Sequence, residues 1–205
     1  MTTTGSPTTA PTPVGREMFI KEGAVSYVKA TIAMKEFARI VQVECEEVAL
    51  NLLYDINFKM GTELTEESLS PYPQAGKLVD PNDPWLCVRF SVKDFGYMYL
   101  GLYWELLRDG SYELHAVATF EFSKKELYEC ARDKFQGVSS MIDGFPYGAA
   151  GNCLTLSEPI PTEQAASFPL IVDEVFSRFL EEWKRIGGLN GLKSPPNPYS
   201  PTASS

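Results

Sequence analysis

The chain has one histidine, His115, and many glutamates, and both residue types can carry out acid–base or metal chemistry. If the neighbouring strands pair in the register that their apolar faces require, Glu105 faces Glu113 directly across a hairpin. A carboxylate pair can raise the pKa of one member for acid–base catalysis, or it can hold a cation. The alternative is a solvated, mutually repelling pair, with His115 as a surface or interface residue. Because a histidine triad or metal cluster would have His115 alone to use, we predict no catalytic residue and no metal site.

Other chemical motifs are missing from the sequence. A nuclease of the Asp and Glu-x-Lys type needs its carboxylates and lysine on a strand, and neither "EFSKK" nor "ELHAV" supplies them there. No Gly-Lys-Ser or Gly-Lys-Thr is present to form a phosphate loop. The cysteines are scattered singly, without the close pairs of zinc or redox sites; they are Cys45, Cys87, Cys130 and Cys153. We therefore expect no cofactor.

Three successive stretches alternate in the manner of β-strands: "WLCVRFSVK", "FGYMYLGLYWELL" and "YELHAVATFEF". The turn between the last two is decided by requiring their apolar faces to agree. A two-residue loop would place Leu100 beside Thr119 and mix core with surface. A three-residue loop over 108–110, with Gly110 as a left-handed bulge residue, pairs Leu100 with Ala118 instead. We predict this bulged hairpin within an antiparallel meander.

The same register determines which side chains lie on the second face of the meander. It places Trp85 beside Tyr103, Tyr103 beside His115, and Arg89 beside Tyr99. Large amphipathic rings with an arginine among them are enriched at interface hot spots. The candidate binding residues are Trp85, Arg89, Tyr97, Tyr99, Tyr103 and His115. The alternatives are that one of the chain's own helices covers this face, or that the face binds a small ligand.

Helical periodicity is found on both sides of the meander. Apolar residues at spacings of three and four predict helices over 34–61, 123–137 and 167–186. The stretch before the first helix, "AVSYVKATI" over 24–32, alternates enough to be a short strand. Residues 62–84 are rich in acidic, Ser and Pro residues and are predicted to form a loop. Between the second and third helices we expect one or two short strands, the better one from Cys153 to Leu156.

Length and composition favour one domain with a spacer at each end. We predict a disordered tail over 1–17, a single domain over 18–187, and a disordered Pro- and Ser-rich tail over 188–205. The net charge of −9 disfavours nucleic acid, and no apolar run reaches the roughly 18 to 20 residues that span a bilayer. We expect a cytoplasmic protein without a membrane partner. Its expected partners are another protein, including one of basic charge, and a second copy in a dimer.

Three segments carry a likeness to a known family: "DPWLCVRFSV", "FEFSKKELYECARDKFQG" and "LTLSEPIPTEQAASFPLIVDEVFSRFLEEWKRI". In them a meander strand leads into a helix, and a later strand ends in a polar turn before a long amphipathic helix. This order resembles the type III secretion chaperones of bacteria and the related YbjN-type domains. The resemblance implies a small acidic, often dimeric domain that binds another polypeptide and performs no chemistry.

The predicted fold class is therefore α+β: an antiparallel β-meander sheet with long N-terminal and C-terminal helices packed on one face. The predicted function is a non-catalytic protein-binding module of chaperone or adaptor type that uses the aromatic second face. Two alternatives stay open. One is a carboxylate-dependent enzyme, with or without a divalent metal, and the other is an acidic immunity or antitoxin protein.

Overall fold

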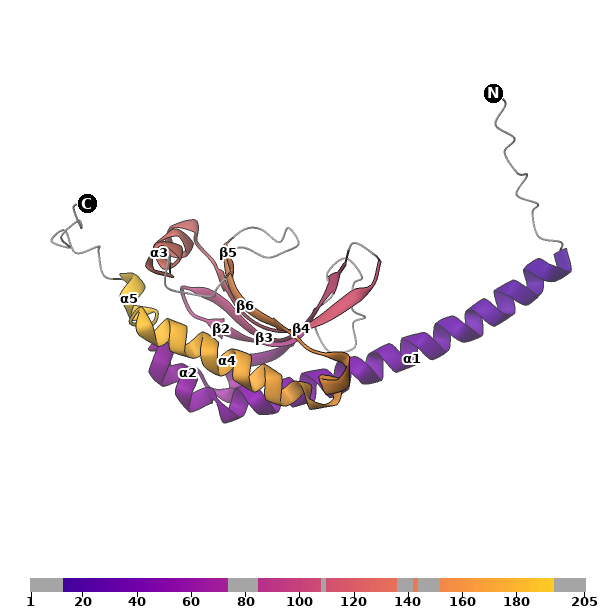
Figure 1. The fold of residues 1–205 in the computed structure, drawn as a ribbon, viewed down its shortest axis with the longest axis horizontal. Helices are drawn as coiled ribbons and strands as arrows, with labels where there is room; N and C mark the ends of the chain where they lie inside the picture. The colour runs from indigo at the N-terminus through magenta and orange to yellow at the C-terminus, as the bar shows by residue number, and fades with distance from the viewer. Residues whose placement is uncertain (1–12, 74–84, 108–109, 136–141, 144–151, 194–205) are drawn as a thin grey trace, which may run out of the picture.

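The computed structural model describes residues 13–73, 85–107, 110–135, 142–143 and 152–193. Figure 1 shows α1, α2 and α4 along one side of a curved sheet, with the first half of α1 extending away from it. The helices are α1 (Pro13–Asn51), α2 (Leu53–Met60), η1 (Glu66–Ser68), α3 (Lys125–Phe135), η2 (Thr162–Ser167), α4 (Phe168–Arg185) and α5 (Asn190–Lys193). The strands are β1 (Leu69–Tyr72), β2 (Trp85–Val92), β3 (Gly96–Leu106), β4 (Tyr112–Phe122), β5 (Ile142–Asp143) and β6 (Cys153–Pro159). This is the predicted α+β class.

The sheet has the strand order β1-β2-β3-β4-β6-β5, and the paired strands are antiparallel. Its central register is the predicted one, because Leu100 pairs with Ala118 and Tyr103 pairs with His115. Gly110 has a φ of 84°, as a left-handed bulge residue requires, and its N–H donates to the Leu107 carbonyl. The predicted hairpin is confirmed at its described positions, while residues 108 and 109 lie outside them.

The core lies between one face of the sheet and helices α1, α3 and α4. The buried apolar residues of α4 are Val172, Val175, Phe176, Phe179, Leu180 and Trp183. The ring of Trp183 lies 5.1 Å from that of Phe120 on β4 and 5.3 Å from that of Phe135 on α3. Burying each side chain of this size contributes roughly 1.5–3 kcal/mol. The long C-terminal helix is thus held against the meander by its aromatic stripe.

Helix α1 is longer than predicted, and the predicted strand over 24–32 is wrong. These residues are helical, and the helix begins at Pro13, a residue type suited to a first helical turn. A strand needs a neighbour to pair its backbone groups, whereas a continuing helix pairs them within the segment. The predicted C-terminal end near Gly61 is confirmed, because Gly61 caps α2 in the left-handed conformation.

The predicted loop over 62–84 is also wrong in part, because it contains an edge strand. In β1, Leu69 pairs with Phe90 and Tyr72 pairs with Cys87. The prolines in and near this strand argue against a central position in the sheet, because proline has no N–H to donate to a neighbouring strand. An edge strand can contain proline, since it has a neighbouring strand on one side only. Residues 74–84 lie outside the described part of the chain.

Both predicted tails extend too far into the folded part of the chain. At the N-terminus, α1 already includes residues 13–17. At the C-terminus, Leu189 and Leu192 are buried, and the Leu189 N–H donates to the Met60 carbonyl at 2.8 Å. The chain after α4 therefore closes over the end of α2. The remaining parts of the predicted tails, 1–12 and 194–205, lie outside the described residues.

Gly101 allows β2 and β3 to approach closely. A Cβ atom at this position would lie 2.3 Å from the Leu86 carbonyl oxygen and 2.5 Å from the Cys87 Cα. Both are backbone atoms of the neighbouring strand, so they can yield only if the strand shifts. Gly23, in the exposed part of α1, has no such neighbour within 4 Å.

We predict that Gly101→Ala lowers the free energy of unfolding by about 1–3 kcal/mol, because the added methyl overpacks the contact between strands. The matched change Gly23→Ala should leave this free energy unchanged, or raise it by up to about 1 kcal/mol, since alanine favours a helix. Urea denaturation followed by circular dichroism measures both. A Gly101→Ala protein as stable as wild type would contradict the close approach of β2 and β3.

Candidate functional site

The second face of the meander carries two groups of side chains. The Arg89 cluster consists of Tyr72, Arg89, Tyr97, Tyr99 and Glu121, and the His115 cluster consists of Glu105, Glu113 and His115. Trp85 and Tyr103 lie beside the His115 cluster, with their ring centroids 5.2 Å apart. The strand registers place all six residues of the sequence prediction on this one face. Their role in binding stays a prediction.

The Arg89 guanidinium lies against two aromatic rings. Its Cζ atom is 4.9 Å from the ring centroid of Tyr97 and 5.7 Å from that of Tyr72. Contacts of this kind contribute about 0.5–1 kcal/mol at exposed sites. Arg89 Nε also donates to Ser70 Oγ at 3.3 Å. The sequence analysis missed Tyr72 because it predicted a loop where β1 lies. The alternation of Tyr72 with Ser70 was the available signal for a strand, and the nearby prolines obscured it.

Tyr99 donates its hydroxyl proton to Glu121 Oε2 at 2.6 Å, which links β3 to β4 within the Arg89 cluster. Partial burial, followed by the Glu121 carboxylate, raises the pKa of Tyr99 well above its ordinary value. The phenol therefore stays protonated through the physiological pH range. In this position Tyr99 is a hydrogen-bond donor rather than an acid or a base.

In the His115 cluster, two carboxylates converge on one imidazole nitrogen. His115 Nε2 lies 3.1 Å from Glu113 Oε2 and 3.4 Å from Glu105 Oε2. Glu105 faces Glu113 across the hairpin, as predicted. Glu113 and His115 share a face because they are two residues apart on β4. The sequence indicated the carboxylate pair and the histidine separately, and the hairpin brings all three together.

The second face is not uniformly accessible. Tyr103 is 2% exposed and His115 is 9% exposed, whereas Tyr97 is 39% exposed. At the centre of this face the buried hydroxyls of Thr119 and Thr155 share a hydrogen bond of 3.0 Å. Helices α1 and α4 pack with the opposite, Leu- and Phe-rich face. A large partner can therefore reach the rim of the second face at Tyr97 but not its centre.

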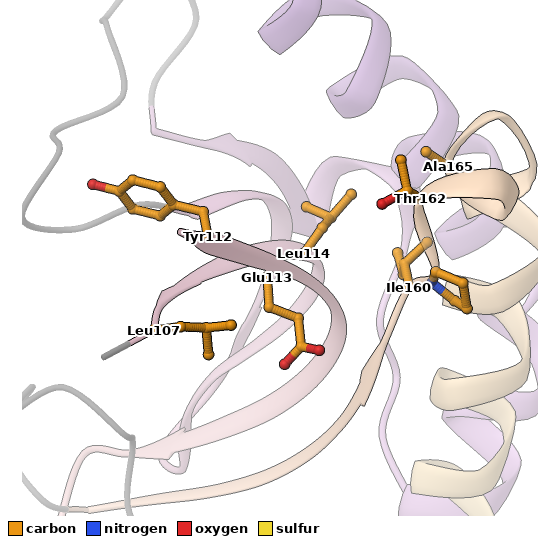
Figure 2. Close-up of a pocket in the computed structure, with 8 residues that line it drawn as sticks. Leu107, Tyr112, Glu113, Leu114, Ile160, Thr162 and Ala165 are labelled. Carbon is orange, nitrogen blue, oxygen red and sulfur yellow. The ribbon is translucent and has the colours of Figure 1, made fainter. Parts of the chain in front are cut away.

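A pocket of about 350 Å³ lies where the start of β4 meets the end of β6 and η2. Figure 2 shows Leu114 and Ile160 close to Thr162, while the Glu113 carboxylate points away from Leu114. The lining residues are Leu107, Tyr112, Glu113, Leu114, Ile160, Pro161, Thr162 and Ala165. Glu113 thus belongs to both the pocket and the His115 cluster.

Two buried cysteines offer no nucleophile. Burial raises the pKa of Cys45 to about 12 and that of Cys153 to about 12. The thiolate is the reactive form of cysteine, so both side chains stay protonated and inert near neutral pH.

A different candidate surface lies on α1. We call residues 18–37 the projecting half, because Ala38 is the first buried residue after them and Figure 1 shows this part of the helix extending beyond the sheet. Its exposed large apolar side chains are Met18, Ile20, Val25, Tyr27, Val28, Ile32, Met34 and Phe37. The sequence analysis missed this surface, because it predicted a strand over 24–32 in place of the helix.

The apolar residues of the projecting half follow the spacing of the buried half. Positions three and four apart run without interruption through Ile20, Ala24, Tyr27, Thr31, Met34, Ala38, Val41, Cys45 and Val48. From Ala38 onward, the residues of this row are buried against the body of the domain. Met18, Val25, Val28 and Ile32 form a second stripe about a third of a turn around the helix from the first. The projecting half is therefore apolar on two sides.

No family model, no curated protein and no solved structure matches this chain. Within the described residues, α1 and the other helices are too short or too polar to cross a membrane.

We predict that Tyr99→Phe lowers the free energy of unfolding at pH 7 by about 1–2 kcal/mol, because Glu121 loses its donor. The ordinary pKa of tyrosine is about 10, so above that pH Tyr99 ionises in the unfolded state but not in the folded protein. The unfolded state then binds fewer protons, and the free energy of unfolding falls as pH rises. The difference between wild type and Tyr99→Phe should therefore shrink above about pH 10.

Urea denaturation at neutral and alkaline pH measures this difference. Tyr54→Phe is the matched control for loss of an exposed hydroxyl, because Tyr54 is exposed on α2, and it should leave the free energy of unfolding at pH 7 unchanged. A difference for Tyr99→Phe that stays constant above about pH 10 would contradict the raised pKa.

Proposed function

We propose that this chain is a non-catalytic protein-binding module of chaperone or adaptor type, and that it binds through the projecting half of α1. The partner that we propose is another copy of the chain, with the α1 helices of the associated copies packed against one another. The observation that carries the proposal is the row of exposed large apolar side chains over residues 18–37, of which Ile32 is 64% exposed.

Apolar groups in this number are unusual on a helix that stays in water. Soluble monomers rarely expose contiguous apolar patches of more than a few hundred Å², and larger ones mark sites of association. A helix on the surface of a globular protein typically has one apolar side. A helix that is apolar on two sides needs other elements to cover both of them. The two stripes of the projecting half fit an assembly in which each α1 contacts more than one neighbouring helix.

The stability of the helix leads to the same conclusion. Isolated helices are marginal in water, because most helical stability in proteins comes from packing an apolar face. The projecting half contains Gly23 and several β-branched residues, such as Val25 and Ile32, which weaken an unsupported helix. Contact with another helix gives the projecting half the packing that the rest of α1, from Ala38 onward, receives from the body of the domain.

The distribution of charge favours α1 as the place where two copies meet. The whole chain carries a net charge of −9, so the bodies of two copies repel each other. Residues 18–37 contain three lysines and two glutamates and are close to neutral. Two projecting helices can therefore approach with little repulsion. A basic protein would instead be attracted to the acidic body.

The second face of the sheet has a smaller part in this proposal than the sequence indicated. Its centre is buried, so the binding residues named from the sequence offer a partner mainly the rim at Tyr97. The resemblance to secretion chaperones, whose domains are often dimeric, is consistent with a protein partner. We place the principal contact on α1 because its apolar groups are exposed and those of the second face are largely not.

We predict that the full chain elutes as an oligomer of at least two copies in size-exclusion chromatography with light scattering. Val25→Glu combined with Ile32→Glu should weaken self-association by at least about tenfold, because each places a charge in an apolar contact. The control combines Ser26→Glu with Ala33→Glu, which adds the same charge at the same spacing on the neighbouring, more polar side of α1. It should associate as wild type does.

Thermal denaturation confirms that both double variants keep the folded body, since residues 18–37 lie outside the buried core. Capture of unrelated proteins by a monomeric wild-type chain would point to another partner on the same helix. A wild-type chain that is monomeric at all concentrations, and whose protein contacts do not change in Val25→Glu with Ile32→Glu, would contradict the proposal.

A further inference from the structure

We propose that Glu105, Glu113 and His115 form a binding site for a divalent transition-metal ion with the ligand preferences of Zn²⁺. This inference is independent of self-association through α1, because the His115 cluster lies on the hairpin of β3 and β4. It also departs from the prediction from sequence, which was that the chain has no metal site.

The separations within the cluster fit a shared ion. Bonds of roughly 2.0–2.2 Å at tetrahedral angles place two ligand atoms about 3.3–3.6 Å apart. His115 Nε2 lies 3.1 Å from Glu113 Oε2 and 3.4 Å from Glu105 Oε2, and all three ligand atoms lie within 4.8 Å of one another. The two His115–glutamate separations need to change by roughly a few tenths of an ångström, and the two glutamate side chains, which are partly exposed, can turn to bring their own oxygens to the same spacing.

A hydrogen bond explains the arrangement less completely. Nε2 of an imidazole carries at most one proton, so it can donate well to only one of the two carboxylates that converge on it. With a neutral imidazole the three side chains carry two negative charges at close range. A divalent cation neutralises both charges and uses the imidazole lone pair as a ligand.

The histidine is held in place before any ion arrives. Its ring is nine-tenths buried, and its centroid lies 6.4 Å from that of Tyr103, which in turn packs on Trp85. Rigid support of this kind is what metal ligands need, because it limits the entropy lost on binding. The two glutamates are fixed opposite each other by the antiparallel pairing.

The surroundings leave room for a further ligand. Three protein ligands leave the fourth tetrahedral position of Zn²⁺ for water or for another molecule. Both glutamate side chains are partly exposed, and Glu113 also helps to line the pocket of about 350 Å³ at the start of β4, seen in Figure 2. The site is therefore reachable from solvent at its glutamate side, although the histidine itself is buried.

The ligand types select the class of metal. Imidazole nitrogen suits Zn²⁺, Co²⁺, Ni²⁺ and Cu²⁺, whereas Mg²⁺ and Ca²⁺ prefer sites made of oxygen alone. One nitrogen with two carboxylate oxygens therefore favours a transition metal. We expect Mg²⁺ to compete weakly for this site.

We predict that the full chain binds one Zn²⁺ in isothermal titration calorimetry, and that Co²⁺ in its place gives the visible absorption of a four-coordinate site. His115→Ala, and Glu105→Gln combined with Glu113→Gln, should each weaken binding by at least about tenfold. The control combines Glu46→Gln with Glu47→Gln, which removes the same charge from the exposed side of α1. It should bind as wild type does.

The paired glutamine variant keeps the shape of both side chains, so it tests the site even if His115→Ala fails to fold. Thermal denaturation without metal checks the fold of each variant. Three outcomes would overturn the proposal: no Zn²⁺ binding by wild type, binding that the folded variants leave unchanged, or an equal loss in the control. Retention in the folded variants would place the bound metal elsewhere on the chain.

Discussion

The alternation of side chains along the meander strands is the constraint on which the rest of the structure depends. A strand directs successive side chains to opposite faces, so burying Met98 and Leu100 in the core places Tyr97 and Tyr99 on the other side. A slip of one residue would exchange the two sets and put phenol hydroxyls into the core. The left-handed Gly110 keeps this agreement through the hairpin. The Arg89 cluster and the His115 cluster both follow from the register.

Because period-two alternation is local and the core must be apolar, the register was predictable from sequence, and with it the neighbours of the six candidate residues. Their accessibility was not predictable, since it depends on sheet curvature and packing. Tyr103 and Tyr97 have the same residue type and lie on the same face, yet one is buried and the other exposed. The contact of His115 with both glutamates depends on side-chain orientation, which spacing along β4 permits but does not determine.

Helix α1 shows why the remaining errors arose. Val41 and Cys45 are buried, while Ile20 and Tyr27, which continue the same spacing, are exposed. Periodicity indicates a helix and its apolar side, but the extent of the sheet decides where cover ends. The β-branched residues within 24–32 favoured a strand locally, and the helix that continues on both sides overrides that preference. The edge strand β1 was missed because proline in a segment argues against a strand. Proline is compatible with a strand at an edge, and the sequence does not show that this segment lies at one.

The central claim is that the projecting half of α1 is covered by another copy of the chain. Amide hydrogen exchange at low and high protein concentration tests this most directly, because it reports protection segment by segment. The account predicts that peptides from residues 18–37 become protected as concentration rises, while peptides from residues 41–60, which pack on the body, are protected throughout. Rapid exchange of residues 18–37 at every concentration, in a chain whose body is fully protected, would contradict it.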